Sequence, residues 1–429
     1  MLRSHYSNEV SKKDYGKKIR VAGWIEDIRN LGGIAFIILR DRAGRMQITA
    51  IKKQNPELFK EIVSLTRESV ISAYGICQQN SKVMNGWELL LEEMEVLAKA
   101  ETPLPMGVID KVNVDFDTRL DNRIIDLRRD EVKAIFMIRH AFIHYASDFL
   151  RKKGFVEVHT PKISASSSEG GTEVFKIDYF GRDAFLVQSP QLYKQMLMAS
   201  GLDRVYEIAW YFRAEEHDTS RHLNESTAID IEMAFIDSEE DVMKVAEELT
   251  DYAIQKILDE NSEELDALHV EVDLPSLPYP RISYDEVVEI LQKEMDFKWG
   301  DDLGTDEENL LAKHLDYELY FIKDFPLEAK PFYAMPSGKY ARAFDLEYKG
   351  MEIASGAQRI HDYSLLAQRM NEFGMKTENF EDYLKAFRYG MPPHGGFGYG
   401  IERFLMRFLN LKNIRECILF PRDRKRLRP

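Results

Sequence analysis

Residues 206–235 read YEIAWYFRAEEHDTSRHLNESTAIDIEMAF, and this stretch decides the fold expected for the larger part of the chain. It begins with β-branched, aromatic and aliphatic residues up to Phe212, and from Ile229 it alternates apolar and acidic residues, so we predict an antiparallel hairpin. The connection is dense in charge and contains Arg213, Glu215, Arg221 and His222. A solvated tip would explain an ordinary charged hairpin. Fixed charge directly at the strand ends favours instead a functional loop that holds an anion.

Length and composition set the broad class of the protein. The 429 residues exceed what one hydrophobic core usually supports, so two or three domains are expected. No run approaches the roughly 20 apolar residues of a membrane span, and the first residues lack an apolar leader, which predicts a cytoplasmic protein. Cys77 and Cys417 lack the spacing of a disulfide framework or a zinc site. The net charge of −15 excludes general coating of nucleic acid, but a local basic surface can still select one folded RNA.

The N-terminal part carries five short strand patterns separated by turn residues. They cover residues 19–24, 34–39, 46–51, 70–77 and 87–96, with an amphipathic helix at 58–65. This order predicts a five-stranded OB-type barrel over residues 1–101, a fold that usually binds single-stranded nucleic acid. Phe36 and Gln47 would then lie on neighbouring strands, where an aromatic ring can stack on a base and an amide can pair with a base edge. Phe36 as a core residue is the alternative.

The remainder divides into a connection and a second domain. Residues 102–130 are predicted to be a hinge and linker, because prolines interrupt an acidic, irregular stretch. Residues 131–429 are predicted to form an α+β domain, which opens with a helix at 132–153 followed by a strand, either as ordinary packing or as a dimer surface. Residues 238–335 are less informative and suggest a helical insertion, in which the acidic stretch 300–312 is expected at the surface.

Two further patterns suggest ligand contacts. Gln191 and Lys194 follow QSP in the segment 188–194 and are three residues apart at the start of a helix, so both project from one side and can hold a small carboxylate. Glu352 and Ser355 offer hard oxygen ligands that suit Mg²⁺ with phosphates completing its shell. An ideal strand would put them on opposite faces, so a shared metal ion requires a bulge or a strand end near Ser355.

A glycine-rich strand precedes the last helix in MPPHGGFGYGIERFLMRFLNL, residues 391–411. Its glycines clear side chains from a surface, and Glu402 and Arg403 lie in the first helical turn. An Arg at a helix start opposes the helix dipole, so Arg403 is better explained by a ligand. No GK[ST] follows the glycines and no βαβ pattern surrounds them, which excludes a phosphate loop and a dinucleotide turn.

Taken together, three segments resemble the three motifs of class II aminoacyl-tRNA synthetases: the helix and strand ending at Pro161, the stretch 212–215 with its loop and returning strand, and residues 398–403 entering a helix. The N-terminal barrel restricts the resemblance to the aspartate, asparagine and lysine subgroup. QSPQLYK at 188–194 is similar to the aspartyl enzymes of archaeal and eukaryotic type. The resemblance covers the whole chain and implies a catalytic domain built on an antiparallel sheet flanked by helices.

The resemblance also implies an activity and its residues. Aspartate would be activated by ATP to aspartyl-adenylate and then transferred to the 3′ end of tRNA(Asp), through positioning and charge neutralisation. Catalysis would rest on Arg213, Glu352 and Arg403. ATP would be bound by Arg213, Glu215, Arg221, His222, Leu223, Glu352, Gly400, Ile401, Glu402 and Arg403. Aspartate would be bound by Glu169, Gln191, Lys194, Arg213, Ser355 and Arg359, and Mg²⁺ by Glu352 and Ser355.

For the tRNA, the resemblance implies anticodon contacts from Arg29, Phe36 and Gln47, and a homodimer through residues 132–161. Relatives restricted to tRNA(Asp) tend to carry Trp and Lys where this chain has Glu26 and, next to Asn85, Met84, so a relaxed enzyme that also charges tRNA(Asn) is predicted.

A second departure is Ser226, at the position where many relatives stack a Phe on adenine. The alternatives are an asparaginyl-tRNA synthetase and a non-catalytic tRNA-binding paralogue. A pure binder would not need the three residues implied for catalysis, which argues against the paralogue.

Overall fold

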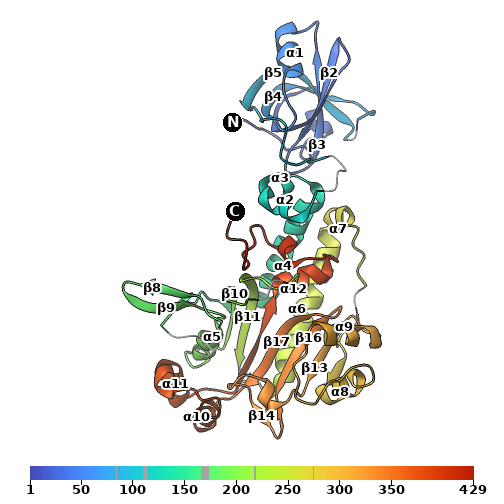
Figure 1. The fold of residues 1–429 in the computed structure, drawn as a ribbon. Coiled ribbons are helices and arrows are strands. Elements are labelled where there is room, and N and C mark those ends of the chain that lie inside the picture. Colours follow the sequence, from blue (N-terminus) through green and yellow to red (C-terminus); the bar gives the residue numbers. More distant parts are fainter. Residues whose placement is uncertain (84, 110–113, 166–172, 217–218, 274) are drawn as a thin grey trace. The chain divides into compact units, whose positions relative to one another are not determined.

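The computed structural model describes residues 1–83, 85–109, 114–165, 173–216, 219–273 and 275–429 (Figure 1). Met84 and Glu169 lie outside these residues. The chain forms two compact units, Met1–Asp115 and Phe116–Pro429. Within the described ranges, every helix is too short or too polar to cross a membrane.

The first unit is a closed five-stranded barrel in the order β1-β2-β3-β5-β4. Its elements are β1 (Lys18–Asn30), β2 (Ile34–Arg40), β3 (Arg45–Ile51), α1 (Pro56–Val63), β4 (Val70–Gln79) and β5 (Trp87–Ala98). Alternate residues such as Ile37 and Leu39 are fully buried in its core. The helix α1 begins where Asn55 accepts a hydrogen bond from the Leu58 amide and Pro56 occupies the first turn. The predicted OB-type barrel, with its helix between the third and fourth strands, is confirmed.

The second unit is built on an eight-stranded sheet in the order β12-β13-β16-β17-β18-β11-β10-β6 (Figure 1). The strands are β6 (Val156–Glu157), β10 (Arg204–Phe212), β11 (Glu225–Ala234), β12 (Arg281–Ser283), β13 (Leu319–Lys323), β16 (Ala343–Tyr348), β17 (Glu352–Arg359) and β18 (His394–Gly400). Only the end pairs β10–β6 and β12–β13 are parallel among these described strands. The predicted antiparallel sheet is therefore confirmed.

The hairpin β10–β11 lies in this sheet as predicted. Its ladder runs from Arg204 opposite Met233 to Phe212 opposite Glu225, so the second strand begins four residues before Ile229. Residues 225–228 pair with residues 209–212 of β10 in the same register as the rest of the ladder. The two faces of β11 differ as the alternation requires, and both are buried.

Helices cover the apolar face of the sheet, where Ile229, Ile231 and Phe397 join the main core. These helices are α4 (Asp130–Lys152), α6 (Glu239–Glu260), α7 (Ser262–Leu268) and α12 (Ile401–Phe408). Phe142 of α4 stacks on Phe404 of α12 with ring centroids 4.2 Å apart. The helix α6 begins at Ser238, whose side chain caps it by accepting from the Glu240 amide. This packing leaves the polar side chains of β11, β16 and β17 to the other face.

Smaller elements surround the sheet. Residues 116–129 lie in the second half of the predicted linker, 102–130. They contain α2 (Phe116–Asp121) and α3 (Arg123–Asp126) and belong to the second unit. The others are β7 (Ile163–Ser164), β8 (Lys176–Tyr179), β9 (Arg182–Leu186), α5 (Gln191–Met198), α8 (Tyr284–Leu291), α9 (Thr305–His314), β14 (Pro336–Ser337), β15 (Tyr340–Ala341), α10 (Tyr363–Glu372) and α11 (Glu381–Arg388).

Candidate active site

A cavity of about 350 Å³ opens on the polar face of the sheet. It is bordered by residues of α5, β10, β11, β17, β18 and α12, which are far apart in the sequence. The sequence-predicted residues that border it are Gln191, Arg213, Glu215, Arg221, His222, Leu223, Glu352, Ser355, Arg359, Gly400, Glu402 and Arg403. Its volume falls in the range of small-molecule sites.

Two buried cations lie beside one end of the cavity: Arg359 borders it, whereas the predicted Lys194 is not among its lining residues and contacts the bordering Asp230. Lys194 Nζ donates to Asp230 Oδ1 at 2.8 Å and to the Phe397 carbonyl at 3.1 Å. Arg359 Nε donates to Glu232 Oε1 at 3.1 Å, while Glu232 Oε2 lies 3.5 Å from Lys194 Nζ. The predicted pair of cations is thus brought together through Glu232. Each cation has a resident carboxylate partner, which the sequence analysis did not assign.

Buried hydrogen-bonding groups at this end have unused capacity. In the described part of the chain, the Gln191 side-chain nitrogen is buried without a hydrogen-bond partner. Gln191 Oε1 accepts from Arg359 Nη2 at 3.4 Å, and no described group accepts from Arg359 Nη1. Burial opposes the charge on Arg359, but Glu232 outweighs it and raises the pKa of the guanidinium. A ligand with acceptor oxygens would satisfy these donors, since buried donors are rarely left unpaired.

Gly396 of β18 lies in close contact with β11 beside this end of the cavity. A Cβ at Gly396 would lie 2.1 Å from the Ile231 carbonyl oxygen and 2.3 Å from Glu232 Oε2. Gly396 therefore lets β18 approach β11 closely while Glu232 keeps its place between the cations. The Tyr211 hydroxyl donates to Asp230 Oδ2 at 2.6 Å, the carboxylate oxygen that Lys194 does not use.

The β10–β11 loop, described for residues 213–216 and 219–224, forms a second part of the site. Arg213 follows β10 directly, and its guanidinium lies over the Tyr211 ring with 5.5 Å to the centroid. Arg213 Nη1 is 3.7 Å from Glu215 Oε1, and His222 Nε2 is 3.9 Å from Glu215 Oε2. Glu215 thus stands between a half-exposed guanidinium and an imidazole. The predicted concentration of charge at the strand end is present.

Arg221 of the same loop is held by α9. Its guanidinium donates to Glu308 Oε2 at 2.5 Å and to the Gly350 carbonyl at 3.0 Å. Glu308 Oε1 in turn accepts from the Glu352 amide at 3.2 Å. The expectation that residues 300–312 form only an acidic surface is wrong here, because Glu308 and Leu311 are buried where α9 packs on the β16–β17 turn.

Glu352 and Ser355 share one face of β17 because the strand bulges. Ser355 pairs with Asp345 and Glu352 pairs with Glu347, so the intervening Ile353 is the extra residue. Asp345 and Glu347 are two apart on β16 and therefore face the same side, which brings four oxygen-bearing side chains together. The bulge that a shared metal ion required is present.

The surrounding charges are uneven. Burial and the nearby carboxylates of Glu308, Glu352 and Asp345 raise the pKa of Glu347 well above its usual value. Glu347 Oε2 is buried without a hydrogen-bond partner among the described residues. Arg403 Nη1 lies 3.3 Å from Glu352 Oε1. This excess of carboxylate suits a divalent cation.

With the geometry established, the comparisons identify the family. Residues 115–424 match the model of the tRNA synthetases class II (D, K and N), and residues 19–97 match the OB-fold nucleic acid binding domain. The chain belongs to the class II tRNA synthetases of the aspartate, lysine and asparagine group.

Relatives cover the whole synthetase. The aspartate–tRNA(Asp) ligase of Thermococcus kodakarensis is 53% identical, and the aspartate–tRNA(Asp/Asn) ligase of Methanopyrus kandleri is 50% identical, each with 100% of both chains covered. Among solved structures, the asparaginyl-tRNA synthetase from Pyrococcus horikoshii complexed with asparaginyl-adenylate is 35% identical, with a TM-score of 0.93 and 100% of both chains covered.

Three predicted ATP residues of the synthetase have side chains that belong to its scaffold. Leu223 and Ile401 are buried in the main core. Glu402 accepts from Thr227 through its amide at 3.0 Å and its hydroxyl at 2.6 Å, and pairs with Arg139 at 2.7 Å. Their ATP contacts stay predictions. Because the Ile401 side chain is buried in the core, only its backbone could contact ATP.

In the barrel, the three predicted anticodon residues share the outer face. Arg29 pairs with Phe36 across β1 and β2, and Gln47 pairs with the neighbouring Ile38. Phe36 is half-buried and alternates with the buried Ala35 and Ile37, so it is not a core residue. A partly exposed ring beside an arginine suits base stacking.

Two of the predicted discrimination residues, Glu26 and Asn85, lie around Arg45. Glu26 is buried and accepts from Arg40 Nη1 at 3.1 Å and from Arg45 Nε at 2.7 Å. The Asn85 side-chain amide donates to the Arg45 carbonyl. Glu26 and Asn85 therefore contact one residue of β3.

Proposed function

We propose that the chain is an aspartate–tRNA ligase, which forms aspartyl-adenylate from L-aspartate and ATP and transfers aspartate to the 3′ end of tRNA(Asp). The observation that carries the proposal is the buried Lys194–Glu232–Arg359 cluster, where Arg359 and the neighbouring Gln191 border the cavity. The full-length relatives named aspartate–tRNA ligases support the same activity.

The cavity allows a division of labour. The substrate side-chain carboxylate would accept from Lys194 and Arg359, and Asp230 and Gln191 would orient the amino-acid backbone. Arg213 would bridge the substrate α-carboxylate and the α-phosphate of ATP. The carboxylate oxygen then attacks the α-phosphorus and the bond to pyrophosphate breaks, with catalysis by alignment and charge neutralisation. Glu215, His222 and Arg403 would hold the nucleotide.

Asparagine fits the same position less well. Its amide NH₂ would point donors at a site where Lys194, Arg359 and Gln191 also present donors, and the unpaired acceptor Glu232 Oε2 is turned toward Lys194 Nζ at 3.5 Å. Facing donors leave buried hydrogen-bonding groups unpaired, and such a mismatch is strongly discriminating. The site therefore favours aspartate over asparagine.

Pyrophosphate exchange tests the activity directly. Purified protein is expected to exchange pyrophosphate into ATP with aspartate and far more slowly with asparagine. Exchange with asparagine alone would replace the proposal with an asparaginyl-tRNA synthetase. Absence of exchange with either amino acid, in protein that binds tRNA, would favour a non-catalytic paralogue.

We further propose that tRNA(Asn) is charged as well. The support is Glu26 and Asn85 around Arg45, together with a relative whose name includes both tRNAs. Transcripts that differ only by C or U at the third anticodon position are expected to differ less than about tenfold in kcat/KM, or roughly 1.4 kcal/mol. A large preference for C contradicts this proposal and leaves the aspartate activity untouched.

Mg²⁺ fits the face of Glu352 and Ser355. In the described part of the chain, no group of three or more His, Cys, Asp or Glu residues is arranged to hold a metal ion, so phosphate oxygens would have to supply most of the shell. Bound there, the ion would neutralise phosphate charge.

The proposed metal site predicts a specific change in thermal unfolding. Adding Mg²⁺ to the ATP complex is expected to stabilise the protein further, by about 2–3 kcal/mol at a hundredfold excess over Kd. Glu352→Gln should remove this increment. Glu318→Gln, which alters an exposed carboxylate paired with Lys349, should keep it. An equal Mg²⁺ increment in Glu352→Gln and the unaltered protein argues against the site.

The homodimer through residues 132–161, the anticodon contacts and a cytoplasmic location remain part of the proposal. The helix α4 supports a dimer by leaving Met137 exposed while its opposite side is buried.

A further inference from the structure

The backbone of the β10–β11 loop rests on the C-terminal segment, residues 413–424. The Ile414 amide donates to the Ser220 carbonyl at 2.9 Å, and Arg415 Nη1 donates to the Thr219 carbonyl at 3.0 Å. The Asn224 amide donates to the Arg422 carbonyl at 2.9 Å. These bonds bracket Arg221 and His222, so the C-terminal segment places the backbone of both residues, while the Arg221 guanidinium is also held by Glu308 and the Gly350 carbonyl.

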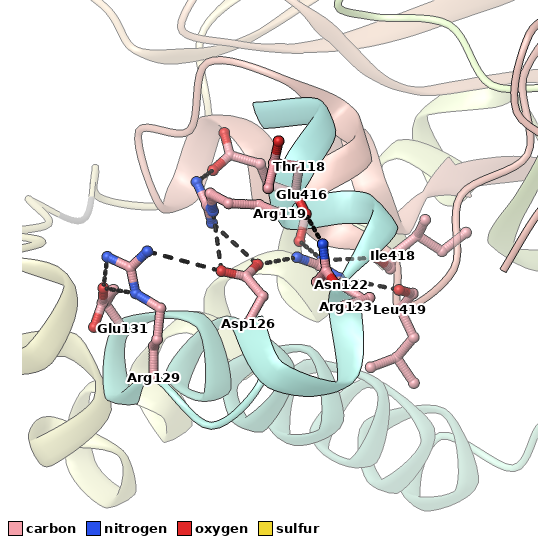
Figure 2. Close-up of polar contacts among 10 residues, drawn as sticks. All are labelled: Thr118, Arg119, Asn122, Arg123, Asp126, Arg129, Glu131, Glu416, Ile418 and Leu419. Carbon is pink, nitrogen blue, oxygen red and sulfur yellow. Dashed lines mark hydrogen bonds and ion pairs between the residues drawn. The ribbon is translucent and has the colours of Figure 1, made fainter. Parts of the chain in front are cut away.

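The same segment is held from its other side by Arg123 of α3 (Figure 2). Arg123 Nε donates to the Leu419 carbonyl at 3.0 Å, and Nη2 donates to the carbonyls of Ile418 at 3.0 Å and Glu416 at 3.2 Å. One guanidinium thus fixes three backbone carbonyls within four residues. Arg139 adds a bond to the Cys417 carbonyl at 3.3 Å.

Arg123 is itself fixed by a buried carboxylate. Its Nη1 donates to Asp126 Oδ2 at 2.8 Å, and Arg119 Nε lies 3.0 Å from the other oxygen (Figure 2). Arg123 is 1% exposed and Asp126 is fully buried. A buried ion pair of this kind is weak evidence for stability alone, because well-packed apolar residues often serve as well. What apolar residues cannot do is hold three carbonyl oxygens in set positions.

We propose that Arg123 is a positioning residue for ATP binding, which acts through the C-terminal segment to place the β10–β11 loop. The inference rests on the proposed function, since it assigns that loop to ATP. Arg123 touches no group that borders the cavity, and its influence passes along two sets of backbone hydrogen bonds. Release of the carbonyls lets residues 414–422 shift, and the backbone of the loop shifts with them, which displaces His222 and strains the contacts of Arg221 with Glu308 and Gly350. Misplacement of about 1 Å is enough to weaken a site built on alignment.

The test replaces Arg123 with glutamine and measures pyrophosphate exchange under varied ATP and varied aspartate. We expect KM for ATP to rise about three- to thirtyfold, with a much smaller change in KM for aspartate. The KM for ATP of Arg123→Lys should lie between those of Arg123→Gln and the unaltered protein, because lysine keeps the charge but not the forked donors. Arg129→Gln is the matched control: Arg129 lies near Asp126 and pairs with Glu131, but it makes no bond to the C-terminal segment (Figure 2).

Hydrogen exchange gives a readout that needs no activity. In Arg123→Gln, the amides of Ile414 and Asn224 should exchange faster than in the Arg129→Gln protein, since both amides donate between the loop and the segment. Arg415→Gln approaches the same contact from the loop side and leaves Arg123 in place. Arg415→Gln should raise KM for ATP by a similar factor. Expressed as free energies, the effect of the double variant on KM should be smaller than the sum of the effects of the two single variants.

Equal rises in the two KM values, or unchanged KM for ATP in folded Arg123→Gln, overturn the inference. Additive effects of Arg123→Gln and Arg415→Gln overturn it as well. Failure of the proposed function is distinguishable, because the unaltered protein would then show no aspartate-dependent exchange at all.

Discussion

Arg213→Gln is expected to lower kcat/KM for aspartate-dependent pyrophosphate exchange by at least about a hundredfold while the protein stays folded. The guanidinium follows β10 directly and borders the cavity. Its side chain is 44% exposed and lies 3.7 Å from Glu215, so it is not part of a tightly packed core. Replacing a side chain that contacts only the ligand should lower the activity strongly and the free energy of unfolding little.

The reason for the size of the effect is the proposed geometry. One guanidinium would contact both the attacking carboxylate and the phosphate under attack. Loss of a charged donor aimed at developing negative charge typically costs about 2.7–4 kcal/mol, or a hundred- to a thousandfold in rate. Because both partners are held, KM for ATP and for aspartate should rise as kcat falls.

Arg204→Gln is the matched control for Arg213→Gln. Arg204 begins the same strand at the opposite end, and its guanidinium donates to the Lys153 carbonyl at 3.0 Å, outside the cavity. The rate of pyrophosphate exchange by Arg204→Gln should stay within about threefold of that of the unaltered protein, because surface substitutions usually change the free energy of unfolding only slightly. If the two variants lose activity equally, Arg213 acts through the fold and not through the ligand.

The sequence predicted the barrel, the hairpin and the antiparallel sheet because these depend on local alternation. In β11, for example, Ile229 and Ile231 point to the core while Asp230 and Glu232 point to the other face, where both contact Lys194, as a period of two already implies. The bulge at Ile353 followed from a chemical requirement on Glu352 and Ser355. Local pattern and site chemistry were therefore sufficient where each constraint acts within a few residues.

The missed residues depend on partners distant in the chain. Glu308 looked like surface charge, since an acidic helix is normally solvated, and only its contact with Arg221, 87 residues away, makes it part of the site. Asp345 and Glu347 read as ordinary strand residues until β17 pairs with β16. Arg123 lay in a stretch predicted as a linker. Partners brought together by the fold leave no local signal in a single sequence.

Lys194→Met is expected to impair both aspartate binding and stability. KM for aspartate should rise at least about a hundredfold, because a buried cation that pairs with the substrate carboxylate is lost. Lys194 is 3% exposed and contacts both Asp230 and Glu232. Its removal leaves two buried carboxylates with one cation, Arg359, which should lower the free energy of unfolding by about 3–5 kcal/mol.

A double variant separates these two effects. In Lys194→Met/Asp230→Asn, the neutral amide relieves the unpaired charge, and its oxygen can still accept from the Tyr211 hydroxyl. We expect part of the unfolding free energy to return, measured by chemical denaturation, while KM for aspartate stays high. Recovery of aspartate binding together with stability would show that Lys194 serves the fold alone.

Lys162→Met provides the control for removing a lysine from an ion pair. Lys162 lies 2.6 Å from the buried Glu207 on β10, and Glu207, unlike the Asp230 that pairs with Lys194, does not border the cavity. It should lower stability without a change in KM for aspartate. A normal KM for aspartate in Lys194→Met would show that Lys194 is not needed to bind the substrate carboxylate, which Arg359 at the cavity would then bind without it.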